Sequence, residues 1–292
     1  MRIGILANPN PVRIGPTVDH FLSLATKKGV EVMLAEDLNR IFNGKTYEFC
    51  NPEKLVVRSE ILVALGGDGT ILRAVTYIRD LNIPILGINT GRLGFLATIS
   101  KDNIKQSVEE VLNDGYSIQE RTLLNLETEP KSKEFSEINF ALNEITIARK
   151  NTTSMIGLKT NLNGEYLTNY WADGLIIATP TGSTGYSLSC NGPVISPDSK
   201  NLVITPIAPH NLNARPMVIS DNTTIQLEIE SREKEFLISV DSRIASVPQN
   251  TKIKITKSTF TIKSIIPKNQ SFLKTLRSKL LWGEDTRNEN SI

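Results

Sequence analysis

The order of hydrophobic periods along the chain is the feature that most constrains its fold. Within the first 120 residues, compact apolar runs alternate with segments whose apolar residues recur every three or four positions. The apolar run at residues 2–7 predicts a strand, and the spacing at residues 18–25 predicts an amphipathic helix. The same alternation predicts strands at residues 30–34, 61–65 and 83–88 and helices at residues 71–78 and 104–112. Strands separated by helices indicate a parallel α/β layer.

The helical pattern stops after about Arg121, and short runs rich in β-branched residues follow. Asn163-Gly164 between two such runs is a hairpin signal, so this half is predicted to be a β-sandwich or similar packing. The runs are 145–147, 174–178, 202–205, 223–229, 236–240 and 252–255. The near-helical spacing at residues 271–282 predicts a final helix that docks back on the molecule, with a disordered polar tail from Glu284. We therefore expect an α/β domain at 1–121, a β-rich domain at 122–266, and a helix with a tail at 267–292.

Composition excludes several classes of protein. The 292 residues suffice for about two domains, and a net charge of +2 without a basic stripe argues against a nucleic-acid partner. No uninterrupted apolar run approaches the length of a membrane-spanning helix, and the apolar stretch at the N-terminus is too short for a secretory signal. Cys50 and Cys190 lie outside any CxxC pair, which fits free thiols in a reducing cytoplasm. His20 and His210 have no second ligand at zinc-like spacing.

The strongest local motif is Gly66-Gly67-Asp68-Gly69-Thr70, between the expected strand at 61–65 and the helix that begins near Ile71. Glycines allow a sharp turn and a close ligand approach, and the N-terminus of the following helix favours phosphate. A carboxylate beside phosphate is unfavourable unless a cation intervenes or the carboxylate has a proton to collect. Both conditions hold in phosphoryl transfer to a hydroxyl, in which Asp68 would take the proton. The alternative is a plain turn in which Asp68 caps the helix.

Two further features suit a nucleotide. The run at 174–178 leads into Thr179–Ser189, a loop of small hydroxyl-bearing residues with Tyr186 available for stacking. Asn143 and Glu144 are adjacent in an expected strand, so at least one of them points inward and needs a partner, such as a ligand hydroxyl. Loops of this composition are commonly just turns, and the Asn-Glu pair is weak evidence by itself.

Three common motifs are missing. The chain has neither the phosphate loop GxxxxGK[ST] nor the GxGxxG fingerprint of dehydrogenases. Around Ser183, a nucleophile elbow would require glycine two positions earlier, where the chain has Thr181. A serine hydrolase is therefore excluded.

Taken together, these segments resemble the NAD kinase family, in its bacterial form that uses ATP or polyphosphate. The GGDGT turn is shared with diacylglycerol and sphingosine kinases and, more loosely, with phosphofructokinases. The more specific segments are Gly87–Leu96, Leu142–Glu144, Asp173–Ser189 and Ala214–Pro216, which stand in the family's order and spacing. The chain departs from the family pattern at Gly185, where the family has alanine, and at Cys190-Asn191, where it has alanine-glycine. Trp171 stands where charged or polar residues often occur.

The resemblance implies that Asp68 accepts the proton of the ribose 2′-hydroxyl of NAD as ATP or polyphosphate gives up its terminal phosphoryl group, forming NADP. It implies that Gly67, Gly69 and Arg73 line the NAD site and that Asn143, Glu144 and Asp173 hold the sugars and amide groups. It implies that Thr184, Gly185, Tyr186, Ser187, Leu188 and Ser189 wrap the adenine end, with Ala208 and Arg243 as flanking contacts. No residue is assigned as a metal ligand.

The resemblance also implies NAD bound between an N-terminal α/β domain and a C-terminal β domain, a divalent cation expected to be Mg²⁺, and a homo-oligomer, dimer or tetramer. The chain is expected in the cytoplasm, without a membrane or nucleic-acid partner. Two alternatives are a lipid kinase built on the same turn and an NAD-binding sensor without catalysis. The sequence leaves open the phosphoryl donor, the use of NADH, the metal, the oligomer size and any feedback by NADP or NADPH.

Overall fold

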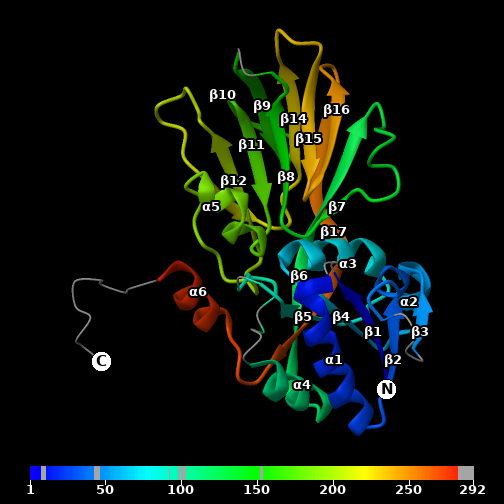
Figure 1. The fold of residues 1–292 in the computed structure, drawn as a ribbon. Helices are drawn as coiled ribbons and strands as arrows, with labels where there is room; N and C mark the ends of the chain where they lie inside the picture. Colours follow the sequence, from blue (N-terminus) through cyan, green and yellow to red (C-terminus); the bar gives the residue numbers. More distant parts are fainter. Residues whose placement is uncertain are drawn as a thin grey trace, which may run out of the picture. The chain divides into compact units, whose positions relative to one another are not determined.

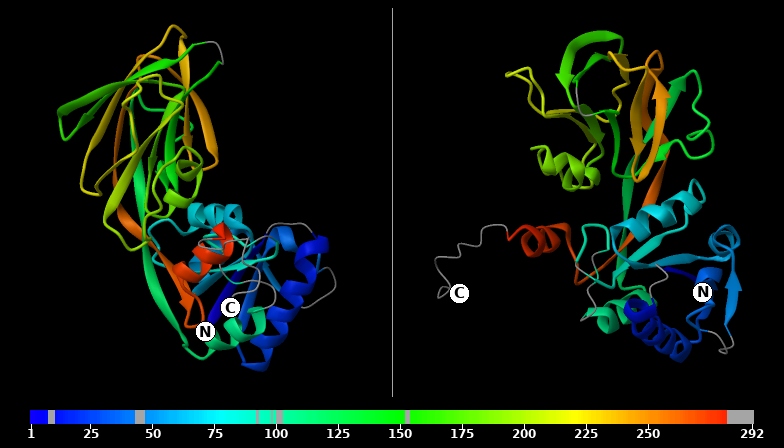
Figure 2. Two further views of the ribbon diagram at one scale, coloured as in Figure 1. Left: turned by 90° about the vertical axis from the view of Figure 1, so that its left-hand side faces the viewer. Right: turned by 45° about the horizontal axis from the view of Figure 1, so that its top comes forward.

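The computed structural model describes residues 1–7, 11–42, 47–91, 93–97, 99, 103–151 and 154–281. Internal contacts divide the chain into two compact units, here called unit 1 (residues 1–119 with 262–292) and unit 2 (residues 120–261). The strands β6 (Tyr116–Glu129) and β17 (Lys252–Pro267) contribute residues to both units. Figures 1 and 2 show the elements of each unit in three orientations.

Unit 1 is built on a parallel sheet in the strand order β5-β4-β1-β2-β3. The strands are β1 (Arg2–Ala7), β2 (Glu31–Ala35), β3 (Glu48–Cys50), β4 (Ile61–Gly66) and β5 (Ile85–Asn89). The central strand β4 is buried at all six positions, as expected for a parallel strand covered on both faces. At the edge of the sheet, Ser264 of β17 pairs with Ile85 in parallel.

Helices cover both faces of this sheet. These helices are α1 (Pro11–Lys27), α2 (Pro52–Arg58), α3 (Asp68–Ile78) and α4 (Ile104–Leu112). Unit 1 also contains a short 3₁₀ helix at Glu36–Leu38 and the predicted C-terminal helix α6 (Phe272–Leu280), which follows β17. Ile3 and Ile5 of β1 share a core with Phe21 of α1 and Val108 of α4. On the opposite face Gly4 lies against Leu55 of α2 and Ser59 directly after that helix, with no room for a side chain.

Unit 2 is a sandwich of two largely antiparallel layers. The first layer runs β10-β9-β14-β17, with β6 beside β17 and β7 beside β6; its further strands are β7 (Phe140–Ala141), β9 (Ile156–Leu162), β10 (Glu165–Ala172) and β14 (Ile225–Glu230). The second layer runs β13-β12-β11-β8-β15-β16. Its strands are β8 (Glu144–Arg149), β11 (Gly174–Ala178), β12 (Asn201–Ile207), β13 (Met217–Ser220), β15 (Glu235–Val240) and β16 (Arg243–Pro248).

The core of unit 2 lies between these layers. Leu158 and Leu227 from the first layer pack in one cluster with Ile177 and Phe236 from the second. The link from β11 to β12 contains a 3₁₀ turn (Gly182–Thr184) and the short helix α5 (Tyr186–Ser189). The predicted fold class, an α/β layer followed by a β-sandwich, is confirmed.

The structure agrees with the sequence-based expectation at one hairpin and differs from it at residues 48–58. The hairpin at Asn163-Gly164 is confirmed, since both residues have positive φ angles of 52° and 85°, as a tight β-turn requires. The segment 48–58, for which no element was expected, forms β3 and α2; the Asn51 side chain caps α2 by accepting from the Lys54 N–H, and Pro52 opens it. The expected tail from Glu284 lies outside the described residues. No helix in the described ranges is long and apolar enough to cross a membrane.

Candidate functional site

The glycine turn of unit 1 joins the end of β4 to the start of α3. Gly66 has a φ of 157°, and a Cβ there would lie 2.1 Å from the Thr70 Oγ1, so a side chain has no room. Gly67 and Gly69, by contrast, face open space. Together with Thr70 and Arg73 they line a hollow of about 300 Å³ at the N-terminus of α3, where the helix favours an anionic ligand.

The Asp68 carboxylate is held by three consecutive backbone N–H groups. The Phe95 N–H donates to the Oδ2 at 2.9 Å, and the N–H groups of Leu96 and Ala97 both donate to the Oδ1 at 3.0 Å. These donors come from the segment after β5, not from the first turn of α3. Asp68 therefore fastens a neighbouring loop to the glycine turn, and helix capping does not account for its position.

Two glycines allow that approach. A Cβ on Gly94 would lie 1.9 Å from the Asp68 Oδ1, and a Cβ on Gly87 would lie 2.4 Å from the Ile71 side chain and 3.0 Å from the Ala97 backbone. The sequence segment 87–96 is thus shaped to fit under the first turn of α3. Arg92, which belongs to that segment, lies outside the described residues. Beyond the loop, the Lys279 ammonium of α6 lies 5.6 Å from the centre of the Phe95 ring.

Arg73 lies one turn along α3 and lines the hollow. Its guanidinium donates to the Ala7 carbonyl oxygen at 2.6 Å and lies 3.5 Å from the Asp37 carboxylate. These contacts fix Arg73 at the carboxyl end of β1. They leave part of its five-donor guanidinium for a ligand.

In unit 2, Asn143 and Glu144 are positioned by Asp241, which the sequence analysis did not single out. The Asp241 Oδ1 accepts from the N–H groups of Asn143 and Glu144 at 2.8 and 3.2 Å, and its Oδ2 accepts from Leu142 at 2.9 Å. Burial raises the pKa of Asp241, although these three hydrogen bonds act to lower it. In the sequence, the supporting role of Asp241 is indicated by no more than its position, directly after the β-branched run of β15 and at the turn to Arg243.

Glu144 has a perturbed carboxyl group. Burial, followed by the charge of Asp241, raises the pKa of Glu144 to about 7, against a lowering by a hydrogen bond from the Tyr186 backbone. Among the described residues, neither the Glu144 Oε2 nor the Asn143 Oδ1 has a hydrogen-bond partner, although both atoms are buried. A Cβ on Gly185 would lie 3.1 Å from the Glu144 Oε2 and 3.9 Å from the Asn143 Nδ2. The structure thus brings Asn143, Glu144 and Gly185 together, with polar atoms left for a ligand.

Several hydroxyl groups of the loop at Thr179–Ser189 form hydrogen bonds within the protein. Gly182 passes so close to Asn143 that a Cβ would lie 2.0 Å from the Asn143 carbonyl oxygen. The Ser183 hydroxyl bonds to the Pro180 carbonyl oxygen, the Thr184 hydroxyl donates to Thr181, and Ser187 pairs with Thr205 at 2.8 Å. The hydroxyls therefore mainly fix the loop. Tyr186 is 45% exposed and free for stacking, and it begins the helix that contains Leu188 and Ser189.

The other predicted site residues flank this loop. Asp173 pairs with Arg149 at 2.9 Å, and its N–H donates to the carbonyl oxygen of Ile207, next to Ala208. Burial raises the pKa of Tyr186 most, the neighbouring Cys190 raises it further, and the charges of Asp173 and Glu144 add to this. Arg243 instead donates to the carbonyl oxygens of Ile138 and Phe140 and lies over the Phe140 ring. Its contacts join the start of β16 to residues 138–140.

The two sets of residues define a class of protein. Unit 1 has a carboxylate in a Gly-Gly-Asp-Gly-Thr turn at the carboxyl end of a parallel strand. Unit 2 is a β-sandwich with an adjacent Asn-Glu pair in which the pKa of the glutamate is raised. This is the arrangement of a small-molecule kinase.

The comparisons with known proteins specify this class. Residues 3–116 match the family model described as the ATP-NAD kinase N-terminal domain, and residues 142–267 match the ATP-NAD kinase C-terminal domain. The chain is 51% identical over 294 residues to the NAD kinase of Christiangramia forsetii, which covers 99% of this chain and 100% of that protein. It is 50% identical to the NAD kinase of Flavobacterium johnsoniae with the same coverage. The chain belongs to the NAD kinase family, as the sequence motifs predicted, and is an enzyme of that family.

Solved structures agree with this assignment. Yeast NADH kinase complexed with NADH superimposes with a TM-score of 0.87 at 26% identity, covering 98% of this chain and 89% of that chain. An NAD kinase from Archaeoglobus fulgidus in complex with ATP gives a TM-score of 0.76 at 27% identity, covering 96% and 99%.

Replacement of Gly94 by alanine is expected to release the loop from Asp68. The added Cβ would lie 1.9 Å from the Asp68 Oδ1, so the loop must withdraw from the carboxylate. Hydrogen exchange at the Phe95, Leu96 and Ala97 amides should accelerate at least about tenfold as their acceptor is lost. Gly91→Ala is the matched control, because its Cβ meets nothing closer than 4.0 Å. Unchanged protection in Gly94→Ala would show that the Asp68 contacts do not hold the loop.

Glu144→Gln is expected to remove a pH dependence of stability. Because the pKa of Glu144 is raised from 4.5 to about 7 in the folded chain, its stabilising contribution is complete below about pH 4.5 and is lost as the pH rises through about 7. The Tm of the parent should therefore fall more steeply between about pH 5 and pH 8 than that of Glu144→Gln. The exposed Glu165 of β10, changed to glutamine, should leave the parent's slope intact. Parallel slopes in all three proteins would contradict the assignment.

Proposed function

We propose that this enzyme transfers the terminal phosphoryl group of ATP to the 2′-hydroxyl of the adenosine ribose of NAD, giving NADP. The family membership supports the kinase reaction, and the Asp68 carboxylate beside the hollow at the N-terminus of α3 is the observation that carries the mechanism. A carboxylate in this place serves a hydroxyl acceptor, because an anion is otherwise unfavourable beside phosphate.

Asp68 acts as the proton acceptor in this proposal. An ionised carboxylate has about four lone-pair sites, and three of them are used by the N–H groups of residues 95–97. The remaining site takes the proton of the ribose hydroxyl as its oxygen bonds to the terminal phosphorus of ATP. The bond from that phosphorus to the bridging oxygen breaks, and ADP leaves with the electron pair. The three N–H groups keep the carboxylate oriented throughout, which supplies the positioning on which phosphoryl transfer relies.

The polar atoms of unit 2 hold the nucleotide acceptor in the proposal. With a pKa near 7, Glu144 is partly protonated at neutral pH and can donate as well as accept. Asn143 and Glu144 would bind the sugars and amide groups of NAD with their unpartnered buried oxygens, because an unsatisfied polar atom gains most from a ligand partner. Tyr186 would stack on a ring, and Asp173 would contact the ligand from the other side of the loop.

A divalent cation, expected to be Mg²⁺, would neutralise the donor phosphates in this reaction. The described residues contain no group of three or more His, Cys, Asp or Glu side chains that would hold such an ion. This fits the usual binding of Mg²⁺ in kinases, in which phosphate oxygens and waters supply most ligands and the protein one or two carboxylates.

The proposal also specifies the phosphoryl donor, the acceptor, the cellular compartment and the assembly of the enzyme. ATP is the proposed donor because the Archaeoglobus fulgidus relative was solved with ATP; polyphosphate is the rival donor. NAD is the proposed acceptor, with NADH as the rival because the yeast relative is an NADH kinase. We place the enzyme in the cytoplasm as a homo-oligomer; the free thiols of Cys50 and Cys190 support a reducing compartment.

The experiment is a panel of donors and acceptors with purified enzyme and Asp68→Asn. NADP formation from ATP and NAD is expected, and Asp68→Asn should lower kcat by about 10²–10⁴-fold, the loss typical of a missing general base. The matched control is Asp80→Asn, the same change at an exposed position just beyond α3. Retention of kcat within about threefold would remove the proton-acceptor role, whereas the absence of any NADP would reject the proposed reaction.

A further inference from the structure

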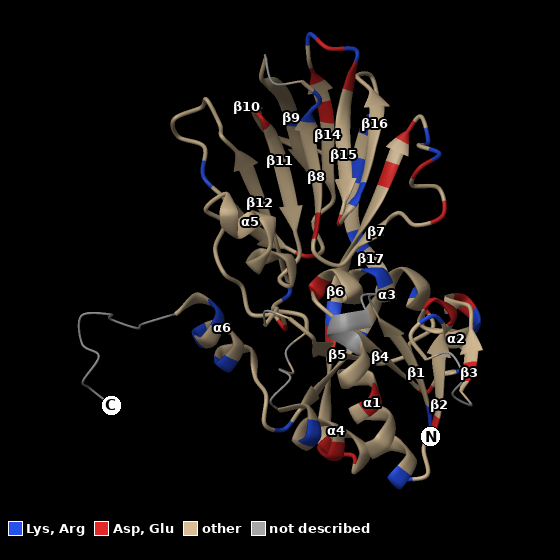
Figure 3. Ribbon diagram, in the orientation of Figure 1, with Lys and Arg blue, Asp and Glu red and all other residues tan. Residues whose placement is uncertain are grey.

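The C-terminal helix α6 has one buried face and charges of a single sign. Residues at positions i, i+3, i+4 and i+7 share one face of a helix, and in α6 these are Phe272, Thr275, Leu276 and Lys279. Thr275 and Leu276 are 3% and 9% exposed, so this face packs against the protein. The three charged residues of α6 are all basic, and Figure 3 shows blue positions on this helix and no red one. Of the three, Lys279 alone continues the buried face.

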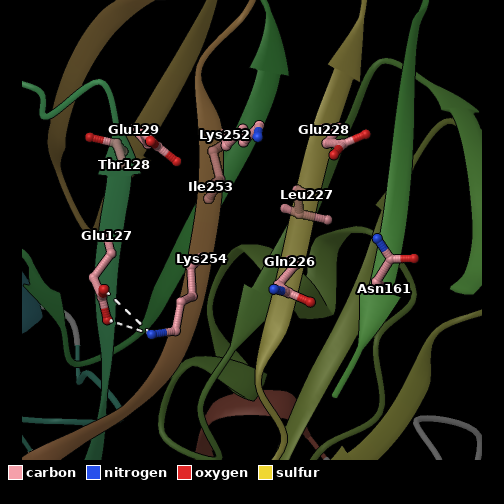
Figure 4. Close-up of a pocket in the computed structure, with 10 residues that line it drawn as sticks. All are labelled: Glu127, Thr128, Glu129, Asn161, Gln226, Leu227, Glu228, Lys252, Ile253 and Lys254. Carbon is pink, nitrogen blue, oxygen red and sulfur yellow. Dashed lines mark hydrogen bonds and ion pairs between the residues drawn. The ribbon is translucent and has the colours of Figure 1, made fainter. Parts of the chain in front are cut away.

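Lys279 has an aromatic ring as its partner. Its ammonium lies 5.6 Å from the centre of the Phe95 ring, within the range of a cation–π contact. Lysines on the surface of unit 2 pair with glutamates instead, as Lys254 does with Glu127 at 3.2 Å (Figure 4). Within the described ranges Lys279 has no ion pair, so the ring is the group that its charge meets in the folded chain.

Phe95 links this contact to the oxygen that the proposed reaction uses. The Asp68 Oδ1 accepts two hydrogen bonds, from the N–H groups of Leu96 and Ala97, whereas the Oδ2 accepts one, from the Phe95 N–H at 2.9 Å. Each carboxylate oxygen has about two lone-pair sites. The site left for the ribose hydroxyl is therefore on the Oδ2, and its direction is set by the Phe95 N–H.

The backbone next to Phe95 does not hold that N–H in place by itself. Residue 94 must be glycine because a Cβ there would overlap the Asp68 Oδ1, and glycine leaves the chain more conformational freedom than any other residue. The Phe95 side chain is only half-buried. A contact on its ring therefore supplies a restraint that the local backbone lacks.

A simpler role for Lys279 is the interaction of a basic residue with the negative end of the helix dipole. Arg277 lies in the same last turn of α6 and shares that role. Residues two apart on a helix do not share a face, and Arg277 has no ion pair or ring contact among the described residues. The dipole accounts for basic residues in this turn but not for the position of Lys279 over the Phe95 ring.

We infer that Lys279 is a positioning residue for the proton transfer, which holds the Phe95 N–H on the Asp68 Oδ2 through its contact with the Phe95 ring. The inference rests on the proposed function, because it assigns the Oδ2 as the oxygen that accepts the proton. Lys279 acts through Phe95 and not on a substrate. The C-terminal helix thus supports the reacting carboxylate of unit 1.

The test combines hydrogen exchange and kinetics of the full-length enzyme with Lys279→Met, which keeps a long side chain and removes its charge. Loss of a cation–π contact at an exposed site corresponds to about a two- to fivefold change. Exchange at the Phe95 amide should accelerate by about this factor. The kcat should fall by the same factor while the KM for NAD stays constant, because the proposed NAD contacts of unit 2 are untouched. Lys279→Arg keeps a cation and should restore both values.

Two controls separate the ring contact from other roles of α6. Arg277→Met removes a cation from the same last turn and should leave exchange and kcat at the parent values. Phe95→Leu keeps an apolar side chain and removes the ring, so Lys279→Met should have no further effect in that background. Circular dichroism of each variant checks that the chain is folded.

Equal effects of Lys279→Met and Arg277→Met would assign the change to the helix dipole and overturn the inference. Additive effects of Lys279→Met and Phe95→Leu, unchanged exchange at Phe95, or faster exchange with an unchanged kcat would overturn it as well. The exchange measurement does not depend on the reaction. A loss of kcat in Asp68→Asn beside parent values in Lys279→Met would therefore remove the role of Lys279 and leave the proposed function standing, whereas full activity of Asp68→Asn would remove both.

Discussion

The candidate site of unit 1 depends on the hydrogen bonds that the Asp68 carboxylate accepts from the N–H groups of residues 95–97. They join two connections of the parallel sheet, the turn after β4 and the loop after β5, at the edge where ligands bind in open α/β sheets. Three consecutive N–H groups outside a strand or helix must find acceptors, and a single carboxylate supplies them all. Hydrogen bonds to a charged acceptor contribute about 1.5–3 kcal/mol each, so the loop and the carboxylate fix each other.

Unit 2 repeats this device with Asp241. Its carboxylate also accepts from three consecutive backbone N–H groups, those of residues 142–144. There the aspartate is not a reacting group in the proposal but the support of the residues that bind. Its charge also acts on Glu144, whose pKa rises to about 7 through burial and this neighbour. One physical arrangement thus orients the proposed proton acceptor in one unit and raises the pKa of a proposed binding residue in the other.

Local pattern predicted the elements whose signal lies within a few residues. The buried run of β4, the glycine turn and the helical spacing of α3 appear in the structure as expected, because parallel strands and helix starts have strong local signatures. The role of Asp241 was invisible, since it depends on pairing between β15 and β8, which are about 90 residues apart in sequence. The contacts of Arg243 and Arg73 were likewise unpredictable, because their side chains bond to the backbone carbonyls of Phe140 in β7 and Ala7 in β1, far away in sequence.

The carboxyl groups of Asp68 and Glu144 differ in the space around them as well as in charge, as their neighbouring glycines show. At Gly94 a Cβ would overlap the Asp68 Oδ1 at 1.9 Å, and the oxygen cannot yield because it is bound by two N–H groups. At Gly185 a Cβ would lie 3.1 Å from the Glu144 Oε2, an atom without a hydrogen-bond partner among the described residues. The alanine of the family pattern would require small shifts of that oxygen and of the Gly182 carbonyl oxygen, which lies 3.2 Å from the same Cβ position. Glycine at 185 therefore leaves extra room beside the Glu144 oxygen, whereas glycine at 94 is a condition of the Asp68 contact itself.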